Sequence, residues 1–387
     1  MEISDLFSKY HKRIEFNYNK EKFLFDVNQS LFSSAHIDKG TFQLIDSLRK
    51  NSKINYNKIL DIGCGYGAIG IVLKKLYPES EITCTDRDAL ALKFTRHNSK
   101  LNNCKIKTLA SLDYSEIDKK EKFNLIVCNY PAKLEKLSLK KFIFEASKYL
   151  NNNGIFAIVI VKELLEDFQE IIKEEIEKEN ISIVHEKKSS GHYVFHLKFK
   201  KELDMKNKEI YTKEKVGYYV GETIYKMETS IDLPEQEFPR QDTLLVIDLI
   251  KNIEKVSEVS IIEPFQGHLV FGVEYYLFPQ KINIISRDLL SLKTTEKNLK
   301  NNGFKNFELS HEYLISNTDK EDLLIWRIEK FLEIQQFKRI LQLMQQKYHQ
   351  ILLIGNKKKL TTFIRHSKPK LKILNKKEQG NFLRIYL

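Results

Sequence analysis

The most informative segment of this 387-residue chain is 58–70, which reads KILDIGCGYGAIG. An apolar run that ends in an acid is followed by glycines at positions 63, 65, 67 and 70, and a helix-like pattern covers 67–77. Glycines at such a junction let the chain turn tightly and leave the N–H groups at the start of the helix open to a ligand. The segment therefore predicts a strand, a ligand-binding turn and a helix.

Two acids accompany these glycines. Asp61 ends the predicted strand, and Asp86 follows the next strand-like run. Gly65, Gly67 and Gly70 match G-x-G-x-x-G, a dinucleotide fingerprint in which a later acid binds the ribose. Asp86 fits either kind of site, whereas Asp61 would repel a pyrophosphate and attract an ammonium group. The alternatives are a dinucleotide site, for which we find no hydride-transfer residues, and a plain turn with a helix cap.

Strand and helix patterns alternate around this segment. The strand-like runs are 58–62, 81–85, 105–109, 123–128 and 155–161, and the helical patterns are 67–77, 87–102, 133–150 and 162–179. Apolar strands that alternate with helices imply a mostly parallel sheet with helices on both faces. A Gly-containing hairpin at 181–199 would add antiparallel strands at one edge.

A third polar element follows the strand-like run 123–128. It reads Asn129-Tyr130-Pro131-Ala132. Because the carboxyl ends of strands meet at the ligand crevice of such a sheet, Asn129 would face the same crevice as Asp61 and Asp86. An amide oxygen and a backbone carbonyl together can accept from an exocyclic amine and orient its lone pair. An ordinary turn is the alternative from these residues alone.

The second half of the chain repeats the first at an offset near 200 residues. TFQLIDSL at 41–48 aligns with TLLVIDLI at 243–250, and 61–73 aligns with 263–275 at the same offset of 202. Further pairs are 86–90 with 286–290, 125–129 with 323–327, and the two terminal hairpins. We therefore predict a catalytic domain over 1–202 and a second domain of the same fold over 210–387, with a polar linker at 200–209.

The second copy lacks the chemistry of the first. In this alignment Gly63 becomes Phe265, Gly67 becomes Leu269, Asp86 becomes Ser286 and Asn129 becomes Arg327. Large side chains would fill the cofactor space, and the ribose acid and the amide are both gone. We expect a degenerate, non-catalytic domain.

Composition and charge limit the class of protein. Hydrophobic residues make up 42% and charged residues 30%, as in folded proteins. The longest apolar run, 154–161, is far short of the ~20 residues of a membrane span. The N-terminus shows no signal-peptide core. The four cysteines form no CxxC pair, which indicates a cytoplasmic protein without disulfides or a metal site.

The net charge of +12 suggests an anionic partner. From Lys357 onward, ten Lys or Arg stand against one acid, Glu378. Four aromatic residues lie in or near this tail: Tyr348, Phe363, Phe382 and Tyr386. The tail could track a phosphate backbone and offer stacking faces to RNA. A solvated Lys-rich face with core aromatics is the alternative.

These motifs resemble a class I S-adenosylmethionine-dependent methyltransferase. The segment Leu31-Phe32-Ser33-Ser34-Ala35-His36-Ile37-Asp38-Lys39-Gly40-Thr41 is similar to the (V/L)FS…D-x-G-T segment of RsmC/RlmG-type ribosomal RNA guanine-N2 methyltransferases, particularly their archaeal members. The resemblance covers residues 15–200 and implies a tandem pair of Rossmann-like α/β domains. Bacterial relatives also pair a live copy with a degenerate one, which there comes first.

The resemblance also implies roles for individual residues. The cofactor would be S-adenosylmethionine, held by Phe32, Ser33, Gly40, Thr41, Asp61, Gly63, Gly65, Gly67, Asp86, Arg87, Ser111 and Leu112. Asn129, the Tyr130 carbonyl and Pro131 would hold the acceptor amine. The family's usual motif is N-P-P followed by an aromatic residue that stacks on the base. Because Ala132 stands at that position here, the ring would have to come from elsewhere, such as Tyr130 or Phe32.

The resemblance implies methylation of guanine N2 in ribosomal RNA, with no metal and no membrane partner. Rival interpretations are methylation of adenine N6 or of a protein glutamine, and a catalytically weak RNA-binding or ribosome-assembly factor. The oligomeric state stays open, with a monomer as the working expectation.

Overall fold

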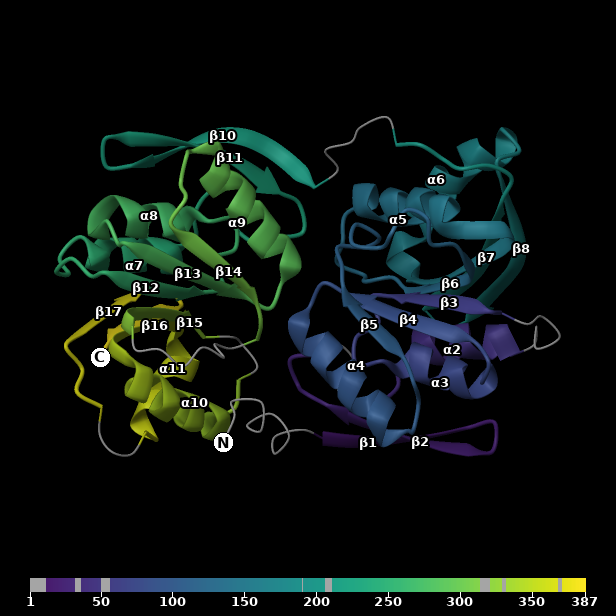
Figure 1. Ribbon diagram of the computed structural model, residues 1–387, viewed down its shortest axis with the longest axis horizontal. Coiled ribbons are helices and arrows are strands. Elements are labelled where there is room, and N and C mark those ends of the chain that lie inside the picture. The colour runs from purple at the N-terminus through teal and green to yellow at the C-terminus, as the bar shows by residue number, and fades with distance from the viewer. Residues whose placement is uncertain are drawn as a thin grey trace. The chain divides into compact units, whose positions relative to one another are not determined.

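The structure is a computed structural model that describes residues 12–31, 36–49, 56–189, 191–205, 211–313, 321–328, 332–367 and 371–387. The chain divides into two compact units, one spanning His11–Tyr211 and one that contains Thr212–Leu387. In the described residues each unit is built on a seven-stranded sheet with helices on both faces (Figure 1). Each unit is described by itself below.

The sheet of the first unit has the strand order β5-β4-β3-β6-β7-β9-β8. Its strands are β3 (Lys58–Ile62), β4 (Glu81–Asp86), β5 (Lys107–Ala110), β6 (Phe123–Asn129), β7 (Leu150–Val161), β8 (Ile181–Ser189) and β9 (His192–Phe199). Neighbours from β5 to β7 are parallel, and β9 pairs antiparallel with both β7 and β8. The predicted parallel sheet with an antiparallel hairpin at one edge is confirmed.

Helices cover both faces of this sheet (Figure 1). They are α2 (Lys39–Arg49), α3 (Ala68–Leu76), α4 (Ala89–Leu101), α5 (Lys136–Tyr149), the short η1 (Lys162–Leu164) and α6 (Leu165–Glu177). The helices α2, α3 and α4 lie on one face, and α5 and α6 lie on the other. Central strand residues such as Leu60, Ile126 and Phe156 are fully buried between these layers, as near-continuous apolar strands require.

An antiparallel hairpin that the sequence analysis did not predict precedes the first sheet. It consists of β1 (Lys12–Tyr18) and β2 (Glu21–Val27), joined at Asn19 and Lys20, both in left-handed conformation. Asn98 of α4 and Asn102, the residue that follows this helix, hold the hairpin. Asn98 Oδ1 accepts from the Asp26 N–H at 2.8 Å, and Asn102 Oδ1 accepts from the Leu24 N–H at 3.0 Å.

The second unit repeats this architecture, with the strand order β14-β13-β12-β15-β16-β18-β17. Its strands are β10 (Thr212–Val220), β11 (Thr223–Ser230), β12 (Glu258–Ile262), β13 (Lys281–Ser286), β14 (Phe307–His311), β15 (Glu321–Arg327), β16 (Tyr348–Asn356), β17 (Asn375–Gln379) and β18 (Phe382–Tyr386). Its helices are α7 (Gln241–Ile250), α8 (His268–Leu277), α9 (Leu289–Asn301), α10 (Ile334–Lys347) and α11 (Lys357–Arg365). Asn298 of α9 and Asn302, which follows this helix, hold β11 in the same manner as their counterparts hold β2. The predicted tandem fold is confirmed.

The structure corrects the alignment of the two copies at the glycine segment. Strand β3 begins at Lys58 and pairs with Glu81, whereas β12 begins at Glu258 and pairs with Lys281, so the offset here is 200 rather than 202. The counterparts of Gly63 and Gly65 are therefore Glu263 and Phe265, and Gly67 corresponds to Gly267. The alignment predicted from the sequence was two residues out of register, because its offset of 202 paired Gly65 with Gly267. Strand pairing, which fixes the equivalence, does not depend on residue type.

Candidate functional site

Asp61 is the most buried polar group of the first unit's glycine segment. Its side chain is 0% exposed, and its Oδ2 accepts from the Gly70 N–H at 2.9 Å. Its Oδ1 has no hydrogen-bond partner among the described residues. Burial raises the pKa of Asp61 to about 7, against the Gly70 hydrogen bond, which favours the ionised form. A carboxylate oxygen that lacks a hydrogen-bond partner is suited to accept hydrogen bonds from a cationic ligand group.

The glycines that follow Asp61 leave space rather than filling it. Gly63 and Gly65 are left-handed, with φ of 68° and 57°, and a Cβ built on either would meet no atom within 4 Å. Gly67 has φ of 90° and differs, because a Cβ there would lie 3.0 Å from Thr95 Cγ2. Gly67 therefore allows close packing at the start of α3, whereas Gly63 and Gly65 line an open cradle.

Asp86 closes the other side of this cradle at the end of β4. Its carboxylate accepts from the Gly65 N–H and from the Asp88 N–H, both at 2.9 Å. Burial, with the nearby Asp88 charge as a second cause, raises the pKa of Asp86 to about 7. Arg87 is half-buried beside it.

The loop after β5 carries Ser111 and Leu112, both buried. The Ser111 N–H donates to the Asp86 carbonyl at 3.1 Å, which places this loop beside the cradle. Its hydroxyl donates to the Asp113 carbonyl and accepts from the Glu116 N–H, so this side chain holds the loop in shape.

Asn129, at the end of β6, belongs to a polar cluster with the start of α2. Its Nδ2 donates to Thr41 Oγ1 at 2.9 Å and lies 3.3 and 3.4 Å from the two Asp38 oxygens. The Thr41 N–H donates to Asp38 Oδ1 at 3.0 Å. An amide that donates through Nδ2 keeps its oxygen as an acceptor for a substrate N–H. Asp38 was missing from the predicted site, although it lies within the quoted D-x-G-T segment.

Two neighbours complete this cluster. A Cβ on Gly40 would lie 2.9 Å from the ring of His192, so only glycine fits there without displacing the histidine. The Tyr130 N–H donates to the Val159 carbonyl at 3.0 Å, which fixes the backbone that follows Asn129.

The Tyr130 ring cannot stack on a base as expected. It is 2% exposed and packs edge-to-face on Phe142 at 5.1 Å between ring centroids, so it belongs to the core beneath α5. Pro131 and Ala132 are exposed. The predicted residues Phe32 and Ser33 lie outside the described residues. The structure therefore brings Gly40, Thr41, Asp61, the glycines, Asp86 and Asn129 to one edge of the sheet, and Arg87, Ser111 and Leu112 to its flank.

In the second unit the counterpart of the cradle is occupied by side chains. Glu263 and Phe265 keep the left-handed backbone of their glycine counterparts, with φ of 62° and 56°. The Glu263 carboxylate accepts from Ser286 Oγ at 2.7 Å and from the Arg287 N–H at 2.9 Å, on the side that corresponds to Asp86.

Arg327 fills the rest of this second site. Its guanidinium lies 4.3 Å from the centroid of the Phe265 ring, 2.5 Å from Asp242 Oδ2 and 2.8 Å from Thr243 Oγ1. Thr243 corresponds to Thr41, so Arg327 takes the place of Asn129. The loss of the cofactor residues was predicted, but their replacement by a buried, internally satisfied network was not.

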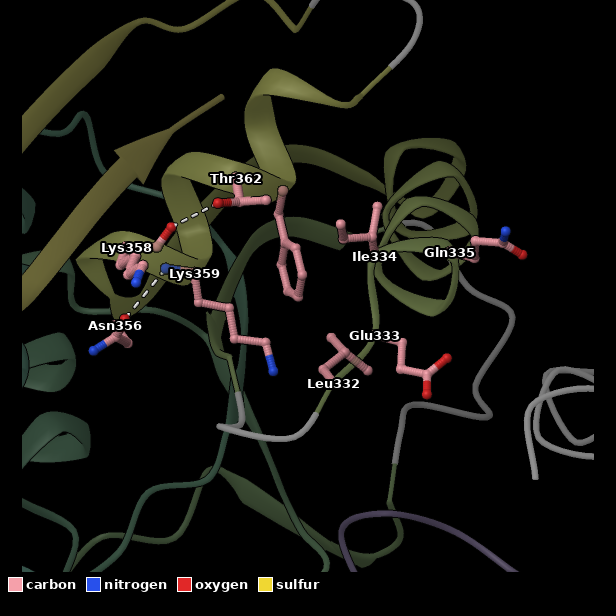
Figure 2. Close-up of a pocket in the computed structure, with 9 residues that line it drawn as sticks. Leu332, Glu333, Ile334, Gln335, Asn356, Lys358, Lys359 and Thr362 are labelled. Carbon is pink, nitrogen blue, oxygen red and sulfur yellow. Dashed lines mark hydrogen bonds between the residues drawn. The ribbon is translucent and has the colours of Figure 1, made fainter. Parts of the chain in front are cut away.

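A separate cavity of about 560 Å³ opens between α10 and α11 of the second unit. Figure 2 shows Lys358, Lys359 and Thr362 of α11 on one side and Glu333 and Gln335 on the other. Part of the basic tail thus lines a recess. The structure pairs other tail charges internally, since Lys357 and Lys376 contact Glu378, and Lys377 and Arg384 contact Asp248.

The tail aromatics do not offer stacking faces as expected. Tyr348, Phe363 and Tyr386 are buried in the core of the second unit, and Phe382 is partly buried beneath Arg240. The alternative of core aromatics is correct for these residues.

Residues 22–194 match the family model described as the methyltransferase small domain. This segment belongs to the methyltransferase small domain family. It contains β3, β4 and β6 with Asp61, Asp86 and Asn129 at their ends, so the family covers the whole cradle.

Similar proteins extend this finding. The ribosomal RNA small subunit methyltransferase C of Haemophilus influenzae strain PittGG is 35% identical over 133 residues, 33% of this chain and 39% of that protein. The chain thus spans about two fifths of the length of that relative. YbxB of Bacillus subtilis strain 168, an uncharacterized protein, is 28% identical over 189 residues, 47% of this chain and 89% of that protein.

A solved structure covers both units. The Thermus thermophilus 16S rRNA N2 G1207 methyltransferase (RsmC), in complex with AdoMet and guanosine, matches 97% of this chain and 98% of its own, with a TM-score of 0.72 and 12% identity. At this identity the match shows the tandem methyltransferase fold alone.

Within the described ranges, no helix is long and apolar enough to cross a membrane. The same residues contain no group of three or more His, Cys, Asp or Glu side chains that could hold a metal ion.

Proposed function

We propose that this chain is an S-adenosylmethionine-dependent RNA methyltransferase that modifies guanine N2 in ribosomal RNA. The observation that carries the proposal is the meeting of two groups at one sheet edge. One is the open cradle of Asp61, Gly63, Gly65 and Asp86, and the other is the amide of Asn129 held by Asp38 and Thr41. The first suits the cofactor and the second suits an amine acceptor.

The residues of the cradle fit S-adenosylmethionine. The unpartnered Asp61 Oδ1 is an acceptor for the ammonium group, and the space over Gly63 and Gly65 admits the methionine chain. Asp86 stands where an acid binds ribose hydroxyls. When bound, the cofactor supplies a sulfonium methyl group for direct displacement by an amine nitrogen. The cytoplasm is the compartment that a ribosomal RNA substrate implies.

The acceptor side aligns an exocyclic amine. The Asn129 amide oxygen and the Tyr130 carbonyl accept its two N–H groups, which orients the nitrogen lone pair toward the cradle. The Asp38 and Thr41 contacts fix the Asn129 side chain before the substrate arrives. A base in a helix must leave its stack to reach this site, which costs a few kcal/mol unless it is already unpaired.

The Haemophilus relative is a ribosomal RNA methyltransferase and the Thermus protein is a 16S rRNA N2 G1207 methyltransferase, which favours ribosomal RNA as the substrate and guanine N2 as the acceptor. The amine site itself also suits adenine N6 or a protein glutamine. The buried Tyr130 and the small Ala132 favour weaker base stacking than in the usual motif, and therefore keep open a catalytically weak RNA-binding or assembly factor.

The test is transfer of tritiated methyl from labelled cofactor to purified ribosomal RNA, compared with a protein pool. Asn129→Ala should lower kcat by roughly 10²–10³-fold, as loss of a transition-state hydrogen-bonding group does, while the cofactor dissociation constant stays unchanged. Asn124→Ala, at the other end of β6, is the control. Label in protein rather than RNA, or an unchanged guanine-N2 map in a deletion strain, would refute the proposed target.

We also propose that the second domain, 210–387, binds RNA without catalysis. The recess between α10 and α11 supports this, because Lys358 and Lys359 line its wall and directly follow Lys357 on the same helix. Lys358→Gln with Lys359→Gln should flatten the salt dependence of RNA affinity by about one unit of slope per phosphate contact. Lys377→Gln, which breaks the pair with Asp248, is the control; equal effects of both changes would contradict the assignment.

A further inference from the structure

A second cavity, in the first unit, lies next to the acceptor site. Its volume is about 310 Å³, and it is lined by residues of β1 and of the segment that leads into α2. The turn at the start of α2 has two sides: Asp38 and Thr41 bind Asn129, whereas Lys39, Phe42 and Gln43 line this cavity. A ligand in the cavity would therefore lie close to the acceptor.

The cavity contains an unsatisfied buried acceptor. Gln43 is 7% exposed and lines the cavity, and its Oε1 has no hydrogen-bond partner among the described residues. Buried side-chain oxygens are normally paired, and leaving one unpaired costs free energy. The oxygen is shielded from solvent in the structure, so an N–H donor from a ligand would satisfy it once the Gln43 amide turns toward the cavity.

Aromatic rings form another part of the wall. Phe42 is 43% exposed, and its ring meets Phe16 edge-to-face at 6.4 Å between centroids. Exposed aromatic rings are the platforms on which unpaired bases stack. Lys39 and His36 line the same cavity and are exposed, and the carboxylate of Glu15 is paired with Lys22 at 2.9 Å. The mouth can therefore accept a phosphate.

We infer that this cavity binds one unpaired nucleobase of the RNA, beside the nucleotide that is methylated. The base stacks on Phe42 and donates an N–H from its edge to Gln43 Oε1, and its phosphate lies near Lys39. The volume lies at the low end of the ~300–1,000 Å³ range of small-ligand sites, as one planar base requires. This inference rests on the proposed function for its RNA partner.

The test measures RNA affinity of the full chain by fluorescence anisotropy. The probes are a fluorescein-labelled single-stranded RNA decamer of mixed sequence and an abasic decamer of equal length. Wild type should bind the base-containing probe more tightly. Phe42→Ala should weaken that binding about 5- to 150-fold, the range expected for loss of a stacked base, and leave abasic binding unchanged. Phe42→Tyr should restore it.

Gln43→Leu keeps the size of the side chain and removes the acceptor. It should weaken binding of the base-containing probe several-fold without lowering the melting temperature, because it removes an unpaired buried group. Ile176→Ala, which truncates another exposed apolar side chain on α6, is the matched control and should change nothing.

Wild-type affinity for Phe42→Ala, or an equal loss on both probes, would overturn the inference. Cofactor titration on the same proteins separates this result from the proposed function. A wild type that binds the decamer through Phe42 but takes up no S-adenosylmethionine refutes the methyltransferase proposal and leaves the base site standing. RNA methylation that is unchanged in Phe42→Ala refutes the base site and leaves the methyltransferase proposal standing.

Discussion

The affinity for S-adenosylmethionine should fall steeply as the pH drops below 7, and the cause is the titration of the two cradle carboxylates, Asp61 and Asp86. Asp61 and Asp86 each have a pKa raised to about 7, chiefly by burial. Only the ionised form of Asp61 attracts the ammonium of the cofactor, and only ionised Asp86 offers both oxygens to ribose hydroxyls. As the pH falls through 7, both become protonated and the binding-competent state is lost.

The size of the effect follows from these pKa values. Well below pH 7, each carboxylate loses ionised population about tenfold per pH unit, because its pKa is about 7. The dissociation constant should therefore rise about tenfold between pH 6 and pH 5 if one carboxylate must ionise, and about a hundredfold if both must. The ammonium of the cofactor stays protonated over this range, since an α-amino group titrates near ~7.7–8.0.

Isothermal titration calorimetry of the full chain at pH 5, 5.5, 6 and 7 measures this directly. Repeating the titration in buffers of different ionisation enthalpy counts the protons released on binding, with one or two expected near pH 5.5. Asp61→Asn should weaken cofactor binding at pH 7. Below pH 7 its dissociation constant should rise about tenfold less per pH unit than that of the wild type, because one titrating carboxylate is gone. Asp46→Asn, on the neighbouring helix α2, should leave the profile unchanged. A dissociation constant that changes less than about threefold between pH 6 and pH 5 would refute the reasoning.

Three further outcomes follow from the same contacts. Without cofactor, Asp61→Asn should raise the melting temperature at pH 8 and lose this advantage by pH 4. The Asp61 pKa is raised from 3.8 to about 7 in the folded state, so the carboxyl costs stability that accumulates between these two pH values and is complete above about 7; an equal gain at pH 8 and pH 4 would contradict this. Gly65→Ala should cost about 1–2 kcal/mol of backbone strain and should also weaken cofactor binding at least tenfold by calorimetry. The control is Gly303→Ala, at a φ of 81° with equally open space, which should show only the strain. Equal cofactor affinities of the two variants would show that the cradle is not the binding site. Arg327→Met removes one of the two guanidinium groups that pair with the buried Asp242 and leaves Arg240 at 3.2 Å. It should destabilise the second unit by about 1–3 kcal/mol in thermal denaturation, with one cofactor still bound per chain; an unchanged transition would mean that the pair is not structural.

Much of the first unit could be predicted because its signals are local. The strand ends at Asp61, Asp86 and Asn129 follow from apolar runs that stop at polar residues, and the structure places them at one sheet edge. The hairpins at 12–27 and 212–230 could not be found in this way. Their backbone groups are held by Asn98 and Asn298, about 70 residues further along the chain, and no local pattern encodes such a contact.

The sequence pattern also did not predict the direction in which a side chain points. Tyr130 follows Asn129 directly, yet its ring turns into the core while Asn129 turns toward Asp38 and Thr41. Gln43 was also missed as a ligand group, because its unpaired oxygen becomes evident only once its neighbours are placed. Spacing predicts which strand end a residue occupies, but packing decides what its side chain can touch.

Comparison with the second unit shows why the loop after β3 of the first unit contains glycines. Glu263 and Phe265 adopt φ of 62° and 56°, nearly the values of Gly63 and Gly65, so the left-handed backbone of this loop does not by itself require glycine. The cost of about 1–2 kcal/mol per residue is tolerated in the second unit, where the side chains contact Ser286 and Arg327. What glycine adds in the first unit is the open space above the loop. Because an unfilled space offers no packing energy of its own, its retention there is best explained by a ligand that occupies it.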